Sequence, residues 1–465
     1  MRPSTTPNSI KKDLETGEKF EPEIVEERLA LPAKRHSKLI RGLRHTYFTV
    51  YRRLFSIIFI ANAIAAVYML AKHGFRSLPQ GALANAASAN FLAAIITRQD
   101  FFVNALYRSA WLLPRRIPLR LKRIVAKVYE HGGVHSGTAV AGTMWYIFLT
   151  VMLTLNISKE NLPVPLLVMT YVLLTVLILI VVFAYPTLRF TTHNTFEIIH
   201  RLGGWTAIAL LWVELILIAE SFGNVQGVSI GHILVRQASF WNLVLITFFV
   251  ILPWLRLRKW EFVPEKLSDH ALRLHFDHNL HIFSCLAISD NPLFEWHPFA
   301  TFPAPHGITG GSMVISDAGD WTHNTIQNPR TKYWVKGIPK AGVLSMGCIF
   351  ERIILVTTGS GIGPSLSYLV DRPKYQECRV VWSTSAPLAT FGSAINDWVK
   401  EVDPQAVIID TRRGGRPDLV QVTYQLYVET NAEAVFVLSN PLLTRKLVYA
   451  MESRGIPAYG PIWDS

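Results

Sequence analysis

A glycine-rich turn is the segment of this 465-residue chain whose residue types and spacing point most directly to chemistry. Residues 356–364 read VTTGSGIGP; they end the apolar run at 353–356 and open a helical stretch. Glycines in such a turn let a ligand approach the backbone closely, and the N-terminal amides of the helix attract phosphate. An ordinary strand–turn–helix junction is the alternative. The context favours a pyrophosphate site made by Gly359, Gly361, Gly363 and Pro364.

Four histidines at the ends of two apolar stretches are candidate iron ligands. His131 and His135 lie one helical turn apart, and His193 and His200 share a face if their helix begins early. An imidazole from each of two helices makes an axial pair for one haem. The alternative is that all four are interfacial residues hydrogen-bonded to headgroups or backbone. The sequence allows a single haem without requiring one.

Apolar stretches in the N-terminal half must position these histidines. Each is close to the length that crosses a bilayer, and the second is Ala-rich, as suits a helix packed against other helices. The sequence predicts a six-helix membrane domain over residues 46–260, preceded by a disordered cytosolic tail over residues 1–45. The predicted helices cover residues 54–71, 81–96, 135–155, 165–185, 203–219 and 240–255.

Basic residues gather on one side of the predicted bundle. They cluster before the first helix, between residues 115 and 127, and at residues 256–259, whereas the opposite loops hold few. Because cytoplasmic flanks collect Lys and Arg, we expect a multi-pass protein of the plasma membrane or endoplasmic reticulum, with the lipid bilayer as partner and both termini cytosolic. This clustering also explains the net charge of +13 without a nucleic-acid-binding stripe. Nucleic acid is therefore not an expected partner.

The pattern changes twice after residue 260. Short alternating stretches at 272–276 and 312–316, broken by Gly and Pro, predict an antiparallel β-barrel over residues 261–345. Later apolar runs alternate with helical stretches, which predicts an α/β nucleotide-binding domain over residues 346–465. The three cysteines lack the spacing of a disulfide framework or a zinc site.

This order of segments resembles a known family. The glycine turn, His297-Pro298-Phe299, the Asp-Trp-Thr at 320–322 and the Gly-Arg-Pro at 415–417 are similar to the ferredoxin reductase-like module of fungal ferric reductases and NADPH oxidases. Over residues 50–465 the chain is identified as a member of the fungal conidiation-associated transmembrane protein A family. It is also similar to the C-terminal part of fungal adenylate-forming membrane flavoproteins.

The resemblance implies two cofactors, FAD and NADPH. His297, Pro298, Phe299 and Thr301 would contact FAD, and the glycine turn would face the nicotinamide nucleotide. Trp463 would take the place of an aromatic residue that shields the flavin ring; a surface or packing role is the alternative.

Arginines near the end of the chain would bind an adenosine-side phosphate. Arg413 and Arg416, with Arg412, follow the apolar run at 406–409. A 2′-phosphate beside them would gain charge-assisted hydrogen bonds, which favours NADPH over NADH. An exposed turn is the alternative.

The sequence departs from the family pattern at several places. Ala300 stands where a hydroxyl residue is expected, residues 335–339 match the flavin pyrophosphate cradle poorly, and Ser439-Asn440-Pro441 replaces Cys-Gly-Pro. The outer histidine pair of the two-haem relay is also absent, because its places hold Met144, Phe148, Leu149, Val213 and Glu214.

These features predict a membrane flavoprotein oxidoreductase that moves electrons from NADPH through FAD to an unknown small-molecule acceptor on the cytosolic side. Specialised metabolism or conidiation signalling is the expected setting. Two alternatives stay open: a transmembrane ferric reductase or NADPH oxidase with haem, and a degenerate reductase that is a non-enzymatic nucleotide-binding sensor or scaffold. No catalytic residue is assigned.

Overall fold

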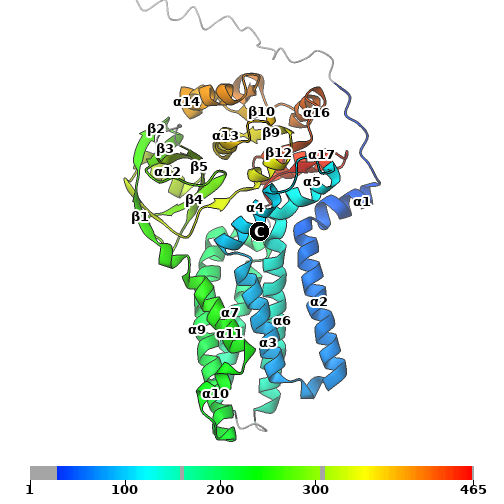
Figure 1. The fold of residues 1–465 in the computed structure, drawn as a ribbon, viewed down its shortest axis with the longest axis vertical. Coiled ribbons are helices and arrows are strands. Elements are labelled where there is room, and N and C mark those ends of the chain that lie inside the picture. Colours follow the sequence, from blue (N-terminus) through cyan, green and yellow to red (C-terminus); the bar gives the residue numbers. More distant parts are fainter. Residues whose placement is uncertain (1–28, 158–161, 304–308, 463–465) are drawn as a thin grey trace, which may run out of the picture.

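A computed structural model describes residues 29–157, 162–303 and 309–462 of the chain. A bundle of long helices forms one end of the molecule, and an antiparallel barrel and an α/β domain lie next to each other at the other end (Figure 1). Trp463 and residues 1–28 of the expected tail lie outside the described residues.

Long apolar helices make up the bundle. Thr49 accepts the amide of Arg52 at the first helix, Pro165 opens another, and Gly227 ends a third in the left-handed conformation, φ +69°. The helices are α2 (Val50–His73), α3 (Gln80–Ile96), α6 (Gly132–Asn156), α7 (Val164–Phe183), α9 (His193–Gln226) and α11 (Ala238–Ile251).

Only some of these helices meet the requirement for crossing a bilayer. Among the described residues, five helical stretches are long and apolar enough to span one: Val50–His73, Leu119–Asn156, Val164–Phe183, His193–Gln226 and Ala238–Arg256. The Ala-rich α3 has 17 residues and packs against α6 and α11. The predicted six-helix membrane domain is therefore not supported; the structure provides candidate apolar helices.

Short helices connect and flank the bundle. Three of them, α4 (Asp100–Trp111), α5 (Leu119–Val125) and η3 (Ala126–His131), lie between the bundle and the C-terminal domains (Figure 1). The others are α1 (Lys38–Gly42), η1 (Leu43–Tyr47), η2 (Phe75–Ser77), α8 (Pro186–Thr191), α10 (Ile230–Val235) and η4 (Trp254–Arg256).

The described part of the expected disordered tail contacts the α/β domain. The Arg35 amide donates to the Ser453 carbonyl at 2.7 Å, and Gln421 donates to the Leu29 carbonyl at 2.6 Å. His45 lies 2.9 Å from Glu452. Residues 29–45 are thus held by backbone and side-chain bonds, a correction to the expectation of disorder over this part.

The predicted antiparallel barrel is confirmed. Its strand order is β1-β7-β4-β5-β6-β3-β2, with β8 beside β4, and only Phe262 separates β1 from β2, so the sheet nearly closes. The strands are β1 (Arg258–Glu261), β2 (Val263–Lys266), β3 (Ala271–Phe276), β4 (Ser284–Ser289), β5 (His297–Pro303), β6 (Gly311–Ser316), β7 (Lys332–Val335) and β8 (Lys340–Ala341); α12 (Asp320–Gln327) follows β6.

The predicted α/β domain is also confirmed. Its parallel sheet has the order β11-β10-β9-β12-β13, and β9 is buried on both faces, as a central parallel strand must be. The elements are β9 (Arg352–Thr358), β10 (Glu377–Thr384), β11 (Val407–Asp410), β12 (Ala434–Leu438), β13 (Ala458–Tyr459), α13 (Ile362–Asp371), α14 (Pro387–Val402), α15 (Thr411–Gly414), α16 (Leu419–Glu429) and α17 (Pro441–Glu452); η5 (Val343–Ile349) and η6 (Gly359–Gly361) precede and follow β9.

One apolar core is shared by the barrel, the α/β domain and the short helices that lie between them and the bundle. It includes Tyr107 of α4, Tyr129 of η3, Phe302 of the barrel, and Leu355 and Trp382 of the parallel sheet. Because these side chains are buried together, the barrel and the α/β domain pack against each other and against the short helices α4 and η3.

Candidate functional site

The carboxyl edge of the parallel sheet holds the predicted nucleotide site. The chain moves from β9 to β10 and β11 on one side, then returns to β12 on the other. The turns after β9 and β12 therefore flank a topological switch point, where open α/β sheets bind ligands.

Glycine is required in the turn after β9. A Cβ on Gly361 would lie 2.5 Å from Thr357 Oγ1 and 2.6 Å from the Leu438 carbonyl oxygen, closer than real contacts allow. Gly359 has φ +49°, and a Cβ there would meet nothing within 4 Å. Gly361 thus lets β9 and β12 pack closely, while Gly359 leaves its side of the turn open. This is a backbone that a pyrophosphate can approach.

Hydrogen bonds fix this turn against its neighbours. Thr357 Oγ1 donates to the Leu438 carbonyl at 3.0 Å, and Trp382 Nε1 donates to the Gly359 carbonyl at 3.2 Å. The Thr358 and Ser439 hydroxyls share a hydrogen bond. Ser439, one of the departures seen in the sequence, is thus a structural partner of the turn.

The predicted arginines lie at the same edge of the sheet, after β11. Arg412, Arg413 and Arg416 are exposed, and Arg413 Nε lies 3.8 Å from Asp410 Oδ2. The Asp410 carboxylate accepts the amides of Ala386 and Arg412 at 2.8 and 2.9 Å. These amides, with nearby Arg413, lower the pKa of Asp410. Asp410 therefore anchors the loop and leaves the guanidinium groups accessible to a phosphate.

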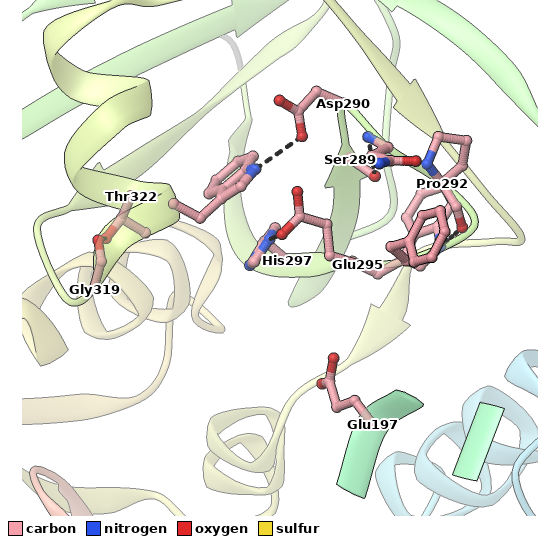
Figure 2. A network of polar contacts seen from close by, with 12 residues as sticks. Glu197, Ser289, Asp290, Pro292, Glu295, His297, Gly319 and Thr322 are labelled. Atoms are coloured by element: carbon pink, nitrogen blue, oxygen red, sulfur yellow. Dashed lines mark hydrogen bonds and ion pairs between the residues drawn. The ribbon is translucent and has the colours of Figure 1, made fainter. Parts of the chain in front are cut away.

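The His297 and Phe299 side chains face an indole. On β5 the His297 ring stacks on Trp321 with centroids 3.9 Å apart, and Phe299 lies 6.1 Å from the same ring. Trp321 donates to Asp290 at 3.0 Å, and Figure 2 shows Glu295 turned toward His297, 3.3 Å from its Nε2. Burial raises the pKa of Glu295, against the lowering effect of His297.

The strand β5 nevertheless lies directly against α13, the helix that follows the glycine turn. Ser367 Oγ of α13 donates to the Thr301 carbonyl at 2.6 Å. Phe302, which faces away from the barrel core, stacks on Trp398 of α14. The two motifs predicted from separate parts of the sequence are therefore brought into contact. Pro298 is exposed on β5, and Ala300 is half-buried.

Other groups assigned to FAD are engaged elsewhere. The Thr301 hydroxyl is buried and donates to the Ser284 carbonyl at 3.0 Å. In the loop at 335–339, expected to cradle the flavin pyrophosphate, the Ile338 amide donates to Asp100 at 3.2 Å. Just after this loop, the Ala341 amide donates to Asn104 at 3.0 Å. The loop does not fit a pyrophosphate, because its Ile338 amide is bonded to α4 and its Gly337 amide donates to the Pro253 carbonyl at 3.3 Å. The fit to FAD is limited to β5 and its contact with α13.

Sequence reasoning missed Asp100 and Asn104. Their spacing of four residues on a helix puts both on one face, which is the one signal the sequence offers. Asp100 also lies 3.3 Å from Lys340, and Asn104 donates to the Pro339 carbonyl at 2.9 Å. They attach the barrel loop to the helical bundle.

The three cysteines are unsuited to thiolate chemistry. Burial raises the pKa of Cys285 to about 11 and the pKa values of Cys348 and Cys378 to about 12. All three are therefore neutral thiols near pH 7.

The structure brings together two of the four candidate haem ligands. The rings of His135 and His200 have centroids 6.2 Å apart. The two rings make a T-shaped contact, with their planes inclined by 64°. His135 Nδ1 donates to the Ala94 carbonyl at 2.9 Å, whereas His200 Nδ1 is buried with no hydrogen-bond partner in the described chain.

The other two histidines are placed elsewhere. His131 Nδ1 donates to the Val128 carbonyl at 3.1 Å, and its ring lies beside Tyr107. His193 is exposed and lies 3.4 Å from Glu197 on the same helix, α9. Figure 2 shows Glu197 apart from the contacts around His297. Among the described residues, no group of three or more His, Cys, Asp or Glu forms a metal site.

Glu214 is part of a buried hydrogen-bond network. Its carboxylate accepts the Tyr146 hydroxyl at 2.8 Å and the Thr170 hydroxyl at 2.6 Å. Asn62 and Asn90, half-buried amides of the bundle, are not part of this network and bond to each other at 2.9 Å. Glu214 is therefore held by α6 and α7 rather than presented to an outer metal.

Comparison with known proteins assigns part of the chain to a described domain. Residues 343–465 match the family model for the C-terminal domain of adenylate-forming reductase 03009. Adenylate-forming reductases 03009 and 06235 of Coprinopsis cinerea are 43% identical over 436 residues and 41% identical over 438. These matches cover 93% and 94% of this chain but only 42% of each relative, so the chain spans less than half their length.

These relatives overturn the identification made from the sequence motifs. They are named adenylate-forming reductases, and none of the matches points to a conidiation-associated or ferric reductase family. The motifs that suggested that family lie in the reductase-like module, and such a module does not distinguish the larger proteins that contain it.

Solved structures of reductases show a distant similarity. A ferredoxin NADP+ reductase from Neisseria gonorrhoeae with bound FAD and NADP matches 44% of this chain and 98% of its own, at 13% identity and TM-score 0.36. Phthalate dioxygenase reductase matches 44% of this chain and 68% of its own, at 12% identity and TM-score 0.36.

Proposed function

We propose that the chain is a membrane-anchored oxidoreductase that takes electrons from NADPH, passes them to FAD and delivers them to a small acceptor on the cytosolic side. The observation that carries this proposal is the contact between β5 and α13, where Ser367 meets Thr301. It puts the expected flavin strand beside the glycine turn of a parallel sheet, at the edge where such sheets bind ligands. The reductase names of the relatives support the same chemistry.

The residues have distinct proposed roles. Gly359 and Gly361 admit the pyrophosphate of NADPH, and Arg413 and Arg416 bind its 2′-phosphate. FAD, held along β5, would accept a hydride and pass electrons on. Because the Ile338 amide of the loop at 335–339 is bonded to Asp100 of α4, the flavin pyrophosphate must use other contacts. The protein's own contribution is to align the two cofactors.

We expect the arginines to set coenzyme preference. Replacing Arg413 and Arg416 together by Ala should weaken NADPH binding about tenfold or more, because each guanidinium loses a charge-assisted hydrogen bond to the 2′-phosphate. NADH binding should not change. Titration of the purified variant with both coenzymes measures this, with Lys374→Ala, an exposed cation elsewhere in the domain, as the control. Equal losses for NADPH and NADH would contradict the assignment.

We expect no electron transfer across the membrane. The His135–His200 pair would hold at most an inner haem, and Glu214 is bonded to Tyr146 and Thr170. Cells overexpressing the protein should not reduce an impermeant extracellular ferric chelate above background. A rise that Gly361→Val abolishes would instead favour a transmembrane reductase.

One observation favours a second function. Asp100 already binds the Ile338 amide, in the loop expected to cradle the flavin pyrophosphate, as it would in a module that binds nucleotide without turnover. A nucleotide-binding scaffold would bind NADPH without oxidising it, with or without added FAD.

A further inference from the structure

A basic cavity lies where the N-terminal segment, the bundle and the α/β domain meet. Its volume is about 1300 Å³, and it is lined by residues of α1, η1, the start of α2, η3 and α17. Eight Lys and Arg residues line it, against two Glu. The excess of positive charge indicates an anionic ligand.

The two acids are already neutralised by other lining residues. Glu452 lies 3.1 Å from Lys127 and 2.9 Å from His45, and Glu130 lies 3.4 Å from Lys127. Lys38, Arg44 and Lys446, by contrast, form no ion pair or hydrogen bond through their side chains within the described chain. Their charges are therefore not balanced by the acids of the cavity.

A second cavity continues the first into apolar surroundings. It has a volume of about 490 Å³ and shares Val50, Ile124 and Lys127 with the basic cavity. Its walls include Leu54, Leu106 and other apolar side chains of α2, α4 and α6. A ligand that fills both must be anionic at one end and apolar at the other.

The position of this pair of cavities matches a membrane surface. Val50, which lines both, is the first residue of α2, an apolar helix of 24 residues. If α2 crosses the bilayer, the basic cavity lies at the depth of the headgroups. Basic pockets of this kind on the cytoplasmic side bind anionic lipid headgroups.

We propose that the composite cavity binds one anionic phospholipid, with its phosphate among Arg44, Arg53 and Lys446 and an acyl chain along Val50, Leu54 and Leu106. Arg53 is fixed for this role, because its Nε donates to the Phe48 carbonyl at 2.8 Å. The proposal rests on the membrane attachment in the proposed function, but not on its redox chemistry. The lipid would join the first helix to α17 of the nucleotide-binding domain.

The test uses the full chain purified in detergent and calorimetric titration with three probes: dioctanoyl phosphatidic acid, dioctanoyl phosphatidylcholine and inorganic phosphate. We expect saturable binding of the phosphatidic acid, and at least tenfold weaker binding of the other two. The double variant R44Q/K446Q should bind phosphatidic acid about tenfold more weakly or worse, as two lost cation contacts imply. Leu54→Trp, whose larger side chain fills the apolar cavity, should weaken the binding of phosphatidic acid but not the binding of phosphate.

The control variant K374Q/K400Q removes two exposed lysines of the α/β domain and should bind phosphatidic acid as the wild type does. NADPH binding by R44Q/K446Q should be unchanged, which separates this proposal from the nucleotide site. Equal affinity for phosphate and phosphatidic acid would show a free-anion site and overturn the lipid assignment. Equal affinity for both lipids, or no effect of R44Q/K446Q, would overturn it as well.

Discussion

Gly361→Val should lower the rate of NADPH oxidation by about 100-fold or more. A Cβ at this position would lie 2.6 Å from the Leu438 carbonyl oxygen, a backbone atom of β12 that cannot move without shifting the strand. The turn that admits the pyrophosphate would be displaced. A displacement of about 1 Å lowers the rate about 100-fold when reactants must be aligned. Initial rates with NADPH and a soluble electron acceptor measure the effect.

Gly231→Ala is the matched control, because a Cβ there meets no atom within 4 Å. Its rate should equal that of the wild type. Circular dichroism and thermal unfolding of both variants show whether Gly361→Val still folds. The rate of Gly361→Ala, which adds a smaller side chain at the same position, provides a second measurement. If the Gly361→Val protein folds and oxidises NADPH at the wild-type rate, the assignment of the nucleotide to this turn is contradicted.

Lys122→Ala should destabilise the contact between the bundle and the α/β domain by about 3–5 kcal/mol. Lys122 of α5 is 3% exposed and lies 3.1 Å from Glu433, which also accepts the Glu351 amide. Removing the lysine leaves a carboxylate with 19% exposure and no counter-charge from Lys122. Denaturant unfolding of the purified protein measures the loss.

A double variant separates lost charge from lost packing. In K122M/E433Q the methionine fills the space of the lysine stem, and the glutamine oxygen can still accept the Glu351 amide. We expect it to recover most of the stability lost in Lys122→Ala. If Lys122→Ala has the same free energy of unfolding as the wild type, the Lys122–Glu433 ion pair does not stabilise the contact between the domains.

The strands of the C-terminal half could be predicted well because their local patterns are strong. The run at 353–356 lies within β9, since a strand buried on both faces is continuously apolar. The place of the glycine turn at the end of β9 could also be predicted, because the turn directly follows this apolar run. Helix length was predicted less well: the expected 203–219 lies within the 34-residue α9.

Contacts between distant segments could not be predicted. The basic stretch at 115–127 was interpreted as a membrane flank, yet Arg123 donates to the Gly455 carbonyl and Lys127 pairs with Glu452. These partners lie more than 300 residues away in the sequence, so the charge pattern alone does not predict them. Asp100 was missed for the same reason, since its partner amide belongs to Ile338.

The absorbance spectrum of the purified protein, recorded before and after anaerobic addition of NADPH, tests the central claim most directly. The account predicts flavin bands in the wild type that NADPH bleaches, and that persist when NADPH is added to Gly361→Val. Protein that carries no flavin and oxidises no NADPH, even after reconstitution with FAD, would contradict the account and favour the nucleotide-binding scaffold.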